Sequence, residues 1–214
     1  MLCRKNTKRR KTVKFFFTNE NVCSIMGDTS GPPAGRTCLW EGAMRGRPSA
    51  CCFTGHRPGK LPWGYAEDDP RCIDLKRRLR DAVETAYAEG YCHFLCGMAQ
   101  GCDLYACECV LALRDRHPEV TVEAALPCPT QADAWPAPQQ VRYRRLLSRC
   151  DYETMVSAAY SPSCMQRRDR YMVDHASLLI AMFDGSAGGT RYTVEYAMRR
   201  GIDVVDLPIV EEQK

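Results

Sequence analysis

The chain has 214 residues, of which 45% are hydrophobic and 26% charged, so it is long enough for one sizeable folded domain of ordinary composition. Its formal charge is +4, but residues 1–46 hold nine of the basic side chains, and residues 47–214 hold 21 basic and 23 acidic ones. This balance gives no reason to expect that the folded part binds nucleic acid. No apolar run approaches the roughly 18 residues of a membrane span or the roughly 7–15 of a secretory signal, so we expect a cytoplasmic protein without membrane contact.

The first 49 residues differ in composition from the rest of the chain. A basic head is followed by stretches rich in Gly and Pro, such as GDTSGPPAGR, which are typical of loops. We expect residues 1–49 to be a basic, poorly ordered extension and residues 50–214 to form the folded domain. A solvated tail explains the composition of the extension better than an arm that binds nucleic acid.

Short apolar runs alternate with amphipathic runs from residue 50 onward. In residues 71–89, for example, Leu75, Leu79 and Val83 recur every four positions among charged residues, which predicts a helix that Gly90 ends. In chain order, the pattern predicts strands at 50–53, 91–96, 120–126, 153–157, 178–183 and 202–207, and helices at 71–89, 103–116, 139–149, 171–175 and 188–200.

This alternation of strands and helices determines the expected architecture. Strands that are separated by helices are joined by crossovers, which favour parallel pairs. We therefore predict an α/β fold, a three-layer sandwich with a mainly parallel sheet and helices on both faces. Ligands of such folds bind beyond the carboxyl ends of the strands. That rule selects the loops after Phe53, Cys96, Leu126 and Phe183.

The loop at residues 97–101, GMAQG, lies between a predicted strand and a predicted helix. Glycines in such a turn let backbone N–H groups face an anion, and the helix start adds a positive dipole end. Asp103 either caps free N–H groups of the helix or accepts hydrogen bonds from ligand hydroxyls or a base edge. Glu108 lies about 140° further round the helix, so it either joins the site or pairs with a basic side chain.

Two further loops carry residues that suit an anion. Residues 184–190, DGSAGGT, place paired glycines and a threonine hydroxyl at a helix start, although a plain glycine turn capped by Thr190 is the alternative. Residues 54–58, TGHRP, offer Arg57 to a phosphate and His56 as a donor or a titrating group, although a solvated surface loop is the alternative. Together, the three loops indicate a site for a phosphorylated, nucleotide-like ligand.

The chain holds 14 cysteines, but no two of them are spaced C-x-x-C, and its four histidines are scattered. Several cysteines lie in apolar strand-like runs, where a thiol behaves as a small hydrophobic side chain. We therefore expect reduced thiols, because the spacing of the cysteines fits a zinc site or a disulfide framework less well. No metal and no cofactor are predicted. The sequence also lacks the P-loop, G-x-S-x-G and H-E-x-x-H motifs.

Five motifs follow one another between about residues 50 and 208. They are T-G-H-R-P at 54–58, G-M-A-x-G-x-D-x-x-x-x-E at 97–108, P-x-x-x-Q-x-x-x-W at 127–135, Y-M-V-D at 171–174 and G-G-T at 188–190. In the order and spacing of these motifs the chain resembles the YpsA-like branch of the SLOG superfamily. The resemblance implies a Rossmann-like sheet related to the DNA-processing protein DprA and to the Lonely Guy phosphoribohydrolases. It also implies a domain that binds or senses nucleotides or their derivatives.

The resemblance implies that Gly101 and Asp103 are the strongest candidates for ligand contact. Gly97 and the glycines and threonines of the other two loops are further candidates. Two departures bear on chemistry. Lonely Guy enzymes carry G-G-x-G-T-x-x-E, whereas here Glu195 stands five residues after Thr190 instead of three. The branch usually has Arg-Asn before its Y-M-V-D stretch, whereas residues 168–169 are Arg-Asp here.

Our leading hypothesis is the binding or sensing of a nucleotide-like phosphorylated small molecule, with no reaction and no catalytic residue assigned. One alternative is hydrolysis of the N-glycosidic bond of a nucleoside monophosphate, with Asp103, Glu108 or Glu195 acting on the substrate. Another is DprA-like binding of single-stranded DNA, although nucleic acid is not the partner we expect for the folded domain.

The oligomeric state stays open, and a homo-oligomer is one option. The candidate ligand-binding residues are Thr54, Gly55, His56, Arg57, Gly97, Met98, Ala99, Gly101, Asp103, Glu108, Asp184, Gly188, Gly189 and Thr190.

Overall fold

Six strands form one sheet in the computed structural model, which describes residues 49–209. All neighbouring strands are parallel, and their spatial order is β4-β3-β2-β1-β5-β6. The predicted α/β class with a mainly parallel sheet is therefore confirmed. Residues 1–48, nearly all of the predicted extension, lie outside the described residues. The strands are β1 (Ala50–Gly55), β2 (His93–Cys96), β3 (Thr121–Leu126), β4 (Tyr152–Met155), β5 (Leu178–Met182) and β6 (Asp203–Asp206).

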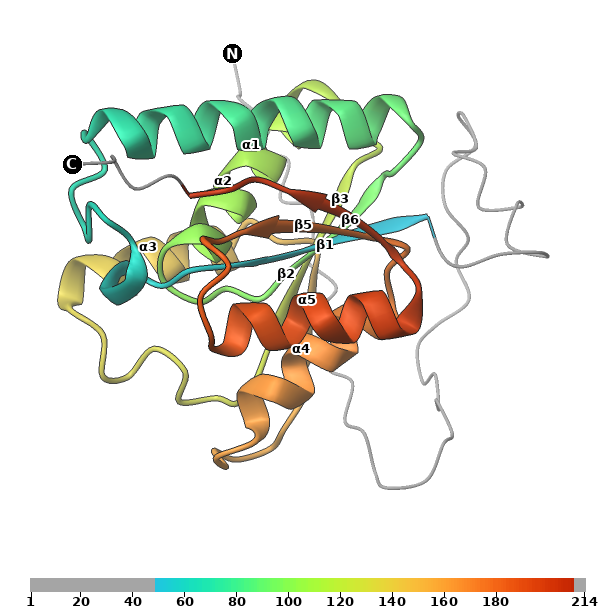
Figure 1. Cartoon of the computed structure of the whole chain (residues 1–214). Coiled ribbons are helices and arrows are strands. Elements are labelled where there is room, and N and C mark those ends of the chain that lie inside the picture. Colours follow the sequence, from blue (N-terminus) through green and yellow to red (C-terminus); the bar gives the residue numbers. More distant parts are fainter. Residues whose placement is uncertain (1–48, 210–214) are drawn as a thin grey trace, which may run out of the picture.

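Helices cover both faces of the sheet, as Figure 1 shows. The first three helices share one hydrophobic cluster with one face of the sheet, and the last two share a second cluster with the other face. The expected three layers are therefore present. The helices are α1 (Pro70–Ala88), α2 (Cys102–Arg116), α3 (Ala137–Leu147), α4 (Cys164–Asp174) and α5 (Gly189–Arg200).

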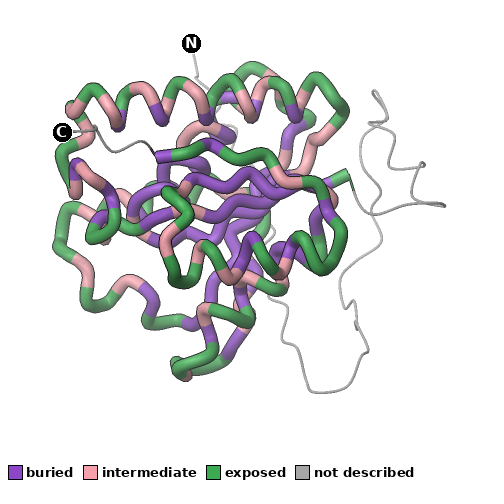
Figure 2. Tube along the Cα trace, in the orientation of Figure 1, coloured by how far each residue is buried: buried purple, intermediate pink, exposed green. Residues whose placement is uncertain are grey.

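The central strand β1 contributes to both hydrophobic clusters. Cys51 and Phe53 pack in the cluster with α1 and α2, whereas Cys52, between them, packs in the cluster with α4 and α5. A parallel strand covered on both faces is apolar at consecutive positions, which explains why the run ACCF shows no alternation. Figure 2 shows the same concentration of buried positions along the sheet.

Most predicted elements overlap the observed ones, with ends that differ by at most two residues. The exception is the predicted helix at 171–175, because α4 begins earlier, at Cys164. The side chains that α4 buries are Cys164, Arg168, Met172 and Val173. Since one of these core positions is an arginine, the apolar repeat is interrupted there and the first two turns do not resemble an amphipathic helix.

The order of the strands fixes where a ligand is expected. Strand β1 lies between β2 and β5, so the chain first builds the sheet toward β4 and then returns to the other side of β1. The carboxyl ends of β1 and β5 form the point at which the strand order reverses, which is the usual ligand position in such sheets. Within residues 49–209, no helix is long and apolar enough to cross a membrane.

Candidate anion-binding site

The loops after β1, β2 and β5 meet at the carboxyl edge of the sheet. His56, directly after β1, donates its backbone N–H to Met182 O at 3.1 Å, and its carbonyl accepts from Cys102 N at 3.1 Å. Gly101 has φ +85°, and a Cβ atom there would lie 2.6 Å from the His56 carbonyl oxygen. The glycine is therefore required where the two loops touch. Gly55 is similarly tight, because its Cβ would lie 2.3 Å from Cys102 Cβ.

The His56 side chain links the first loop to the last one. It is only 2% exposed, and its Nε2 lies 2.7 Å from Asp184 Oδ1, while Nδ1 lies 3.4 Å from the Thr190 hydroxyl. Asp184 also accepts from Ser186 N at 2.8 Å. The hydrogen bonds from His56 and from Ser186 hold the pKa of Asp184 well below its usual range. His56 therefore fixes the shape of the 184–190 loop, and Thr54, two residues earlier, is buried at the end of β1.

The first turn of α5 is open to an anion. Gly188 precedes the helix with φ +149°, no side chain caps the helix start, and its first turn contains no acidic residue. Among the described residues 49–209, no atom lies within 4 Å of the place of a Cβ at Gly189, so this part of the structure leaves free space at the helix start. A helix start leaves backbone N–H groups without intrahelical acceptors and carries partial positive charge.

One basic side chain from the β1 loop, Lys60, lies beside the loop that leads to this helix start, whereas the Cα of Arg57 lies beside Gly101. Lys60 donates from Nζ to Ala187 O at 2.5 Å, and its Nζ lies 2.9 Å from the place of a Cβ at Gly188. Lys60 ends a short 3-10 helix, Pro58–Lys60, that Arg57 precedes, and both basic residues are exposed. Sequence reasoning did not select Lys60, although it stands two residues after the T-G-H-R-P motif.

The 97–101 loop differs from the predicted open cradle, because a cation of the protein itself lies against it. Arg168, buried in α4, donates from Nη1 to Gly97 O and lies 3.4 Å from Asp103 Oδ2. Its Nε donates to Asp169 Oδ1 at 2.7 Å. Gly97 leaves no room for a side chain, since a Cβ would lie 2.1 Å from Arg168 Nη1. The residues Met98, Ala99 and Gly101 are buried as well.

Asp103 is part of this buried arrangement. Its side chain is 6% exposed, and Oδ2 accepts from Ala99 N of the preceding loop at 3.2 Å. No side-chain hydrogen bond caps the start of α2 within the described residues, so Asp103 does not play the helix-capping role considered from the sequence. Burial raises the pKa of Asp103, and Arg168 opposes that shift. A direct contact between Asp103 and a ligand stays a prediction. The sequence resemblance drew attention to residues 168–169, but Arg168 was not among the candidate site residues, because an arginine on a core-facing position has no signal in hydrophobic periodicity.

The loop after β3 supports the 97–101 loop from the other side. Gln131 donates from Nε2 to Met98 O at 2.7 Å, and Met98 has φ +58°, which is rare for a residue with a side chain. The loop after Leu126, which the sequence also selected, therefore lies at the same carboxyl edge of the sheet as the other three loops.

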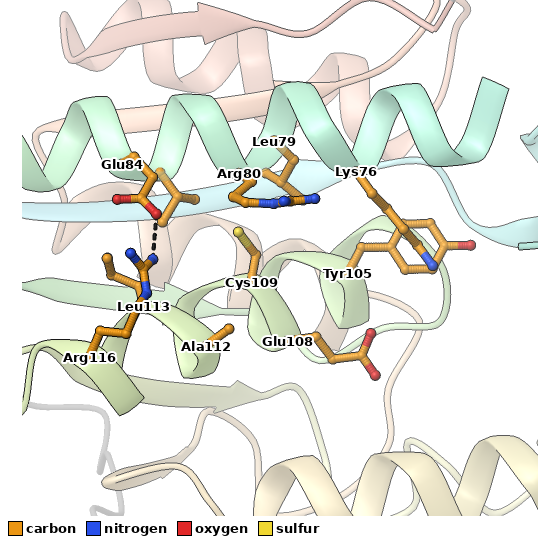
Figure 3. Close-up of a pocket in the computed structure, with 11 residues that line it drawn as sticks. Lys76, Leu79, Arg80, Glu84, Tyr105, Glu108, Cys109, Ala112, Leu113 and Arg116 are labelled. Carbon is orange, nitrogen blue, oxygen red and sulfur yellow. Dashed lines mark hydrogen bonds and ion pairs between the residues drawn. The ribbon is translucent and has the colours of Figure 1, made fainter. Parts of the chain in front are cut away.

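Glu108 lies elsewhere, in a groove of about 220 Å³ between α1 and α2 (Figure 3). Arg142 donates from Nε to Glu108 Oε1 at 2.9 Å and also contacts Glu67, so Glu108 is the partner of a basic side chain. Glu195 is on the exposed side of α5 and pairs with Arg191 at 2.9 Å. The three carboxylates considered for catalysis are therefore not gathered at the start of α5.

These features define a Rossmann-like α/β protein with a candidate anion site where the strand order reverses. Residues 51–204 match the sequence profile of the YpsA family, whose description reads "YspA SLOG family", and the chain belongs to that family. It is 33% identical over 144 residues, 61% of this chain and 84% of the relative, to the uncharacterized SPbeta prophage-derived protein YoqJ of Bacillus subtilis. It is 24% identical to the UPF0398 protein YpsA of the same organism, over 69% of this chain and 83% of the relative.

A solved structure shares the fold. DNA processing protein A from Helicobacter pylori, described by its single-stranded DNA binding mode, superimposes with a TM-score of 0.52. The comparison covers 78% of this chain and 69% of that chain at 14% identity, so it shows the fold alone.

Proposed function

We propose that this protein binds a nucleotide-like phosphorylated small molecule at the carboxyl edge between β1 and β5. The observation that carries the proposal is the start of α5, which has neither a capping side chain nor an acid and lies beside Lys60. A phosphate there would accept hydrogen bonds from N–H groups of Gly189 and Thr190 and would be attracted by Lys60. Membership of the SLOG family supports the assignment.

The proposal is for binding without an assigned reaction. Glu108 and Glu195, two of the three carboxylates considered for hydrolysis, are engaged in ion pairs outside the proposed phosphate position. The third, Asp103, is buried beside Arg168. Because these three carboxylates lie beside arginines and Asp184 is paired with His56, we infer binding rather than hydrolysis from the described residues.

Gly189 allows a sharp test. An aspartate at this position meets no steric obstacle and suits a helix start, but its charge would repel a phosphate. We expect at least one of AMP, GMP, CMP, NAD, ADP-ribose and a cyclic dinucleotide to raise the melting temperature of the full chain. We expect Gly189→Asp to weaken its binding in calorimetry by about tenfold or more, which is about 1.4 kcal/mol.

Gly189→Ala is the matched control, because it adds a side chain of similar position without charge. It should bind like the parent protein. If the parent, Gly189→Asp and Gly189→Ala proteins bind with equal affinity, the ligand's phosphate does not bind at the start of α5. Free base released during the same incubations, and lost in Asp103→Asn, would replace the proposal by hydrolysis. Salt-sensitive binding of a single-stranded oligonucleotide would replace it by nucleic-acid binding.

A further inference from the structure

Three thiols lie in a row between the sheet and the surface. Cys96 ends β2, Cys107 lies on α2, and Cys150 lies between α3 and β4. Cys107 Sγ is 3.9 Å from Cys150 Sγ, and Cys107 also interacts with Cys96. Cys96 and Cys107 are fully buried, whereas Cys150 is partly exposed. All cysteines within residues 49–209 are free thiols.

The distance between Cys107 and Cys150 is short enough for covalent linkage. A disulfide requires sulfur atoms about 2.05 Å apart, so the two sulfurs together need to approach by about 2 Å. The two residues lie 43 positions apart on separate elements, so a bond between them would join α2 to the connection between α3 and β4. Metal binding is a weaker explanation, because the described residues contain no group of three ligating side chains arranged for an ion.

We propose that Cys107 and Cys150 form a redox modification site, in which a small-molecule disulfide oxidises the two thiols to an intramolecular disulfide. The partly exposed Cys150 reacts with the oxidant first, and the buried Cys107 then resolves the mixed disulfide.

The reaction balances in two exchange steps. The Cys150 thiolate attacks one sulfur of glutathione disulfide, which forms a mixed disulfide and releases one glutathione thiolate. Cys107 then loses its proton and attacks the Cys150 sulfur, which forms the Cys107–Cys150 bond and releases the second glutathione thiolate. Two protein thiols are oxidised, one glutathione disulfide is reduced to two glutathione molecules, and the two protons go to solvent or to the released thiolates.

The surroundings of the pair make this reaction slow at neutral pH. The hydrogen bond between the two sulfurs and burial raise the pKa of Cys150. The same hydrogen bond lowers the pKa of Cys107, but the neighbouring Cys96 and burial raise it by more, so the pKa of Cys107 is also raised. Because the thiolate is the nucleophile, the rate of linkage should rise about tenfold from pH 7 to pH 8.

Peptide mapping of the full chain tests the proposal. The reduced protein is incubated with glutathione disulfide at pH 8, remaining thiols are blocked, and the protein is cleaved with chymotrypsin. Cleavage after large side chains gives peptides 106–111 and 148–152, which contain Cys107 with Cys109 and Cys150. We expect these two peptides to appear linked, with the mass of two hydrogens lost, and to separate on reduction.

Two variants assign the bond. Cys150→Ser should abolish the linked peptide, whereas Cys109→Ser should retain it, because Cys109 lies in the groove between α1 and α2. Three outcomes would overturn the proposal: Cys150 trapped as a glutathione adduct that never links to 106–111, a linked peptide that survives Cys150→Ser, or two unchanged peptides after prolonged exposure at pH 9.

Discussion

Arg168 is the single residue that holds the most groups together near the candidate site. It donates to Gly97 O, lies 3.4 Å from Asp103 and pairs with Asp169, at 5% side-chain exposure. Removal of a buried cation leaves its carboxylate partners unpaired, which costs about 3–5 kcal/mol. We therefore expect Arg168→Met to lower the free energy of unfolding by about that amount in urea denaturation.

A control and a double variant separate charge from packing. Arg167→Met, at the exposed neighbouring position, should change stability by less than about 0.5 kcal/mol. Adding Asp103→Asn to Arg168→Met should recover part of the loss, because it removes one buried charge. A double variant that is less stable than either single variant would contradict this account.

Asp184 contributes to the free energy of unfolding, and the size of this contribution depends on pH. Its pKa is lowered in the folded state, chiefly by His56, relative to about 3.9 in an unfolded chain. The stabilisation is therefore present above about pH 4 and is lost as the pH falls below that value. We expect Asp184→Asn to cost about 1 kcal/mol at pH 7, with a smaller difference from the parent protein at pH 3. Urea titrations at both pH values measure this, and a difference that grows toward low pH would refute it.

At the scale of elements, Gly101 sets how closely α2 approaches the end of β1. Its φ is +85°, and a Cβ would lie 2.6 Å from the His56 carbonyl oxygen, which is backbone and moves little. We expect Gly101→Ala to cost about 2–4 kcal/mol, from backbone strain and from the displaced contact. Gly59→Ala is the matched control, because a Cβ there meets nothing within 4 Å. Thermal and urea unfolding of the two variants should differ clearly, and equal stabilities would count against the contact.

The order of the elements was readable from sequence because it depends on local periodicity, as in the Leu75, Leu79 and Val83 stripe of α1. The shared edge of the loops was also readable, since it follows from parallel strands. The partners of individual polar side chains were not. His56 pairs with Asp184, which is 128 residues away, and Arg168 reaches Gly97 across 71 residues. Such pairings arise from strand order and helix rotation, which no local pattern encodes.

At the scale of the whole molecule, residues 49–209 contain the six-stranded sheet and both described hydrophobic clusters. The division into an extension at 1–49 and a domain at 50–214 stays a prediction, which a truncated protein tests. We expect a chain that begins at Ser49 to melt within about 2 °C of the full chain and to bind the same nucleotide, because residues 49–209 hold the described sheet and both hydrophobic clusters. A melting temperature lower by about 10 °C would show that the first 48 residues belong to the folded unit.

Strand β1 is made first by the ribosome, yet one of its two neighbours, β5, begins at Leu178 and pairs Cys51 with that residue. At about 5–20 residues per second, the strand at the centre of the sheet waits roughly 6–25 seconds for its second partner. During that time one edge of this apolar strand has backbone N–H and C=O groups without strand partners, and such an edge can pair with other nascent chains. Efficient production of this protein should therefore depend on early binding of the nascent chain by a chaperone more than its final stability would suggest.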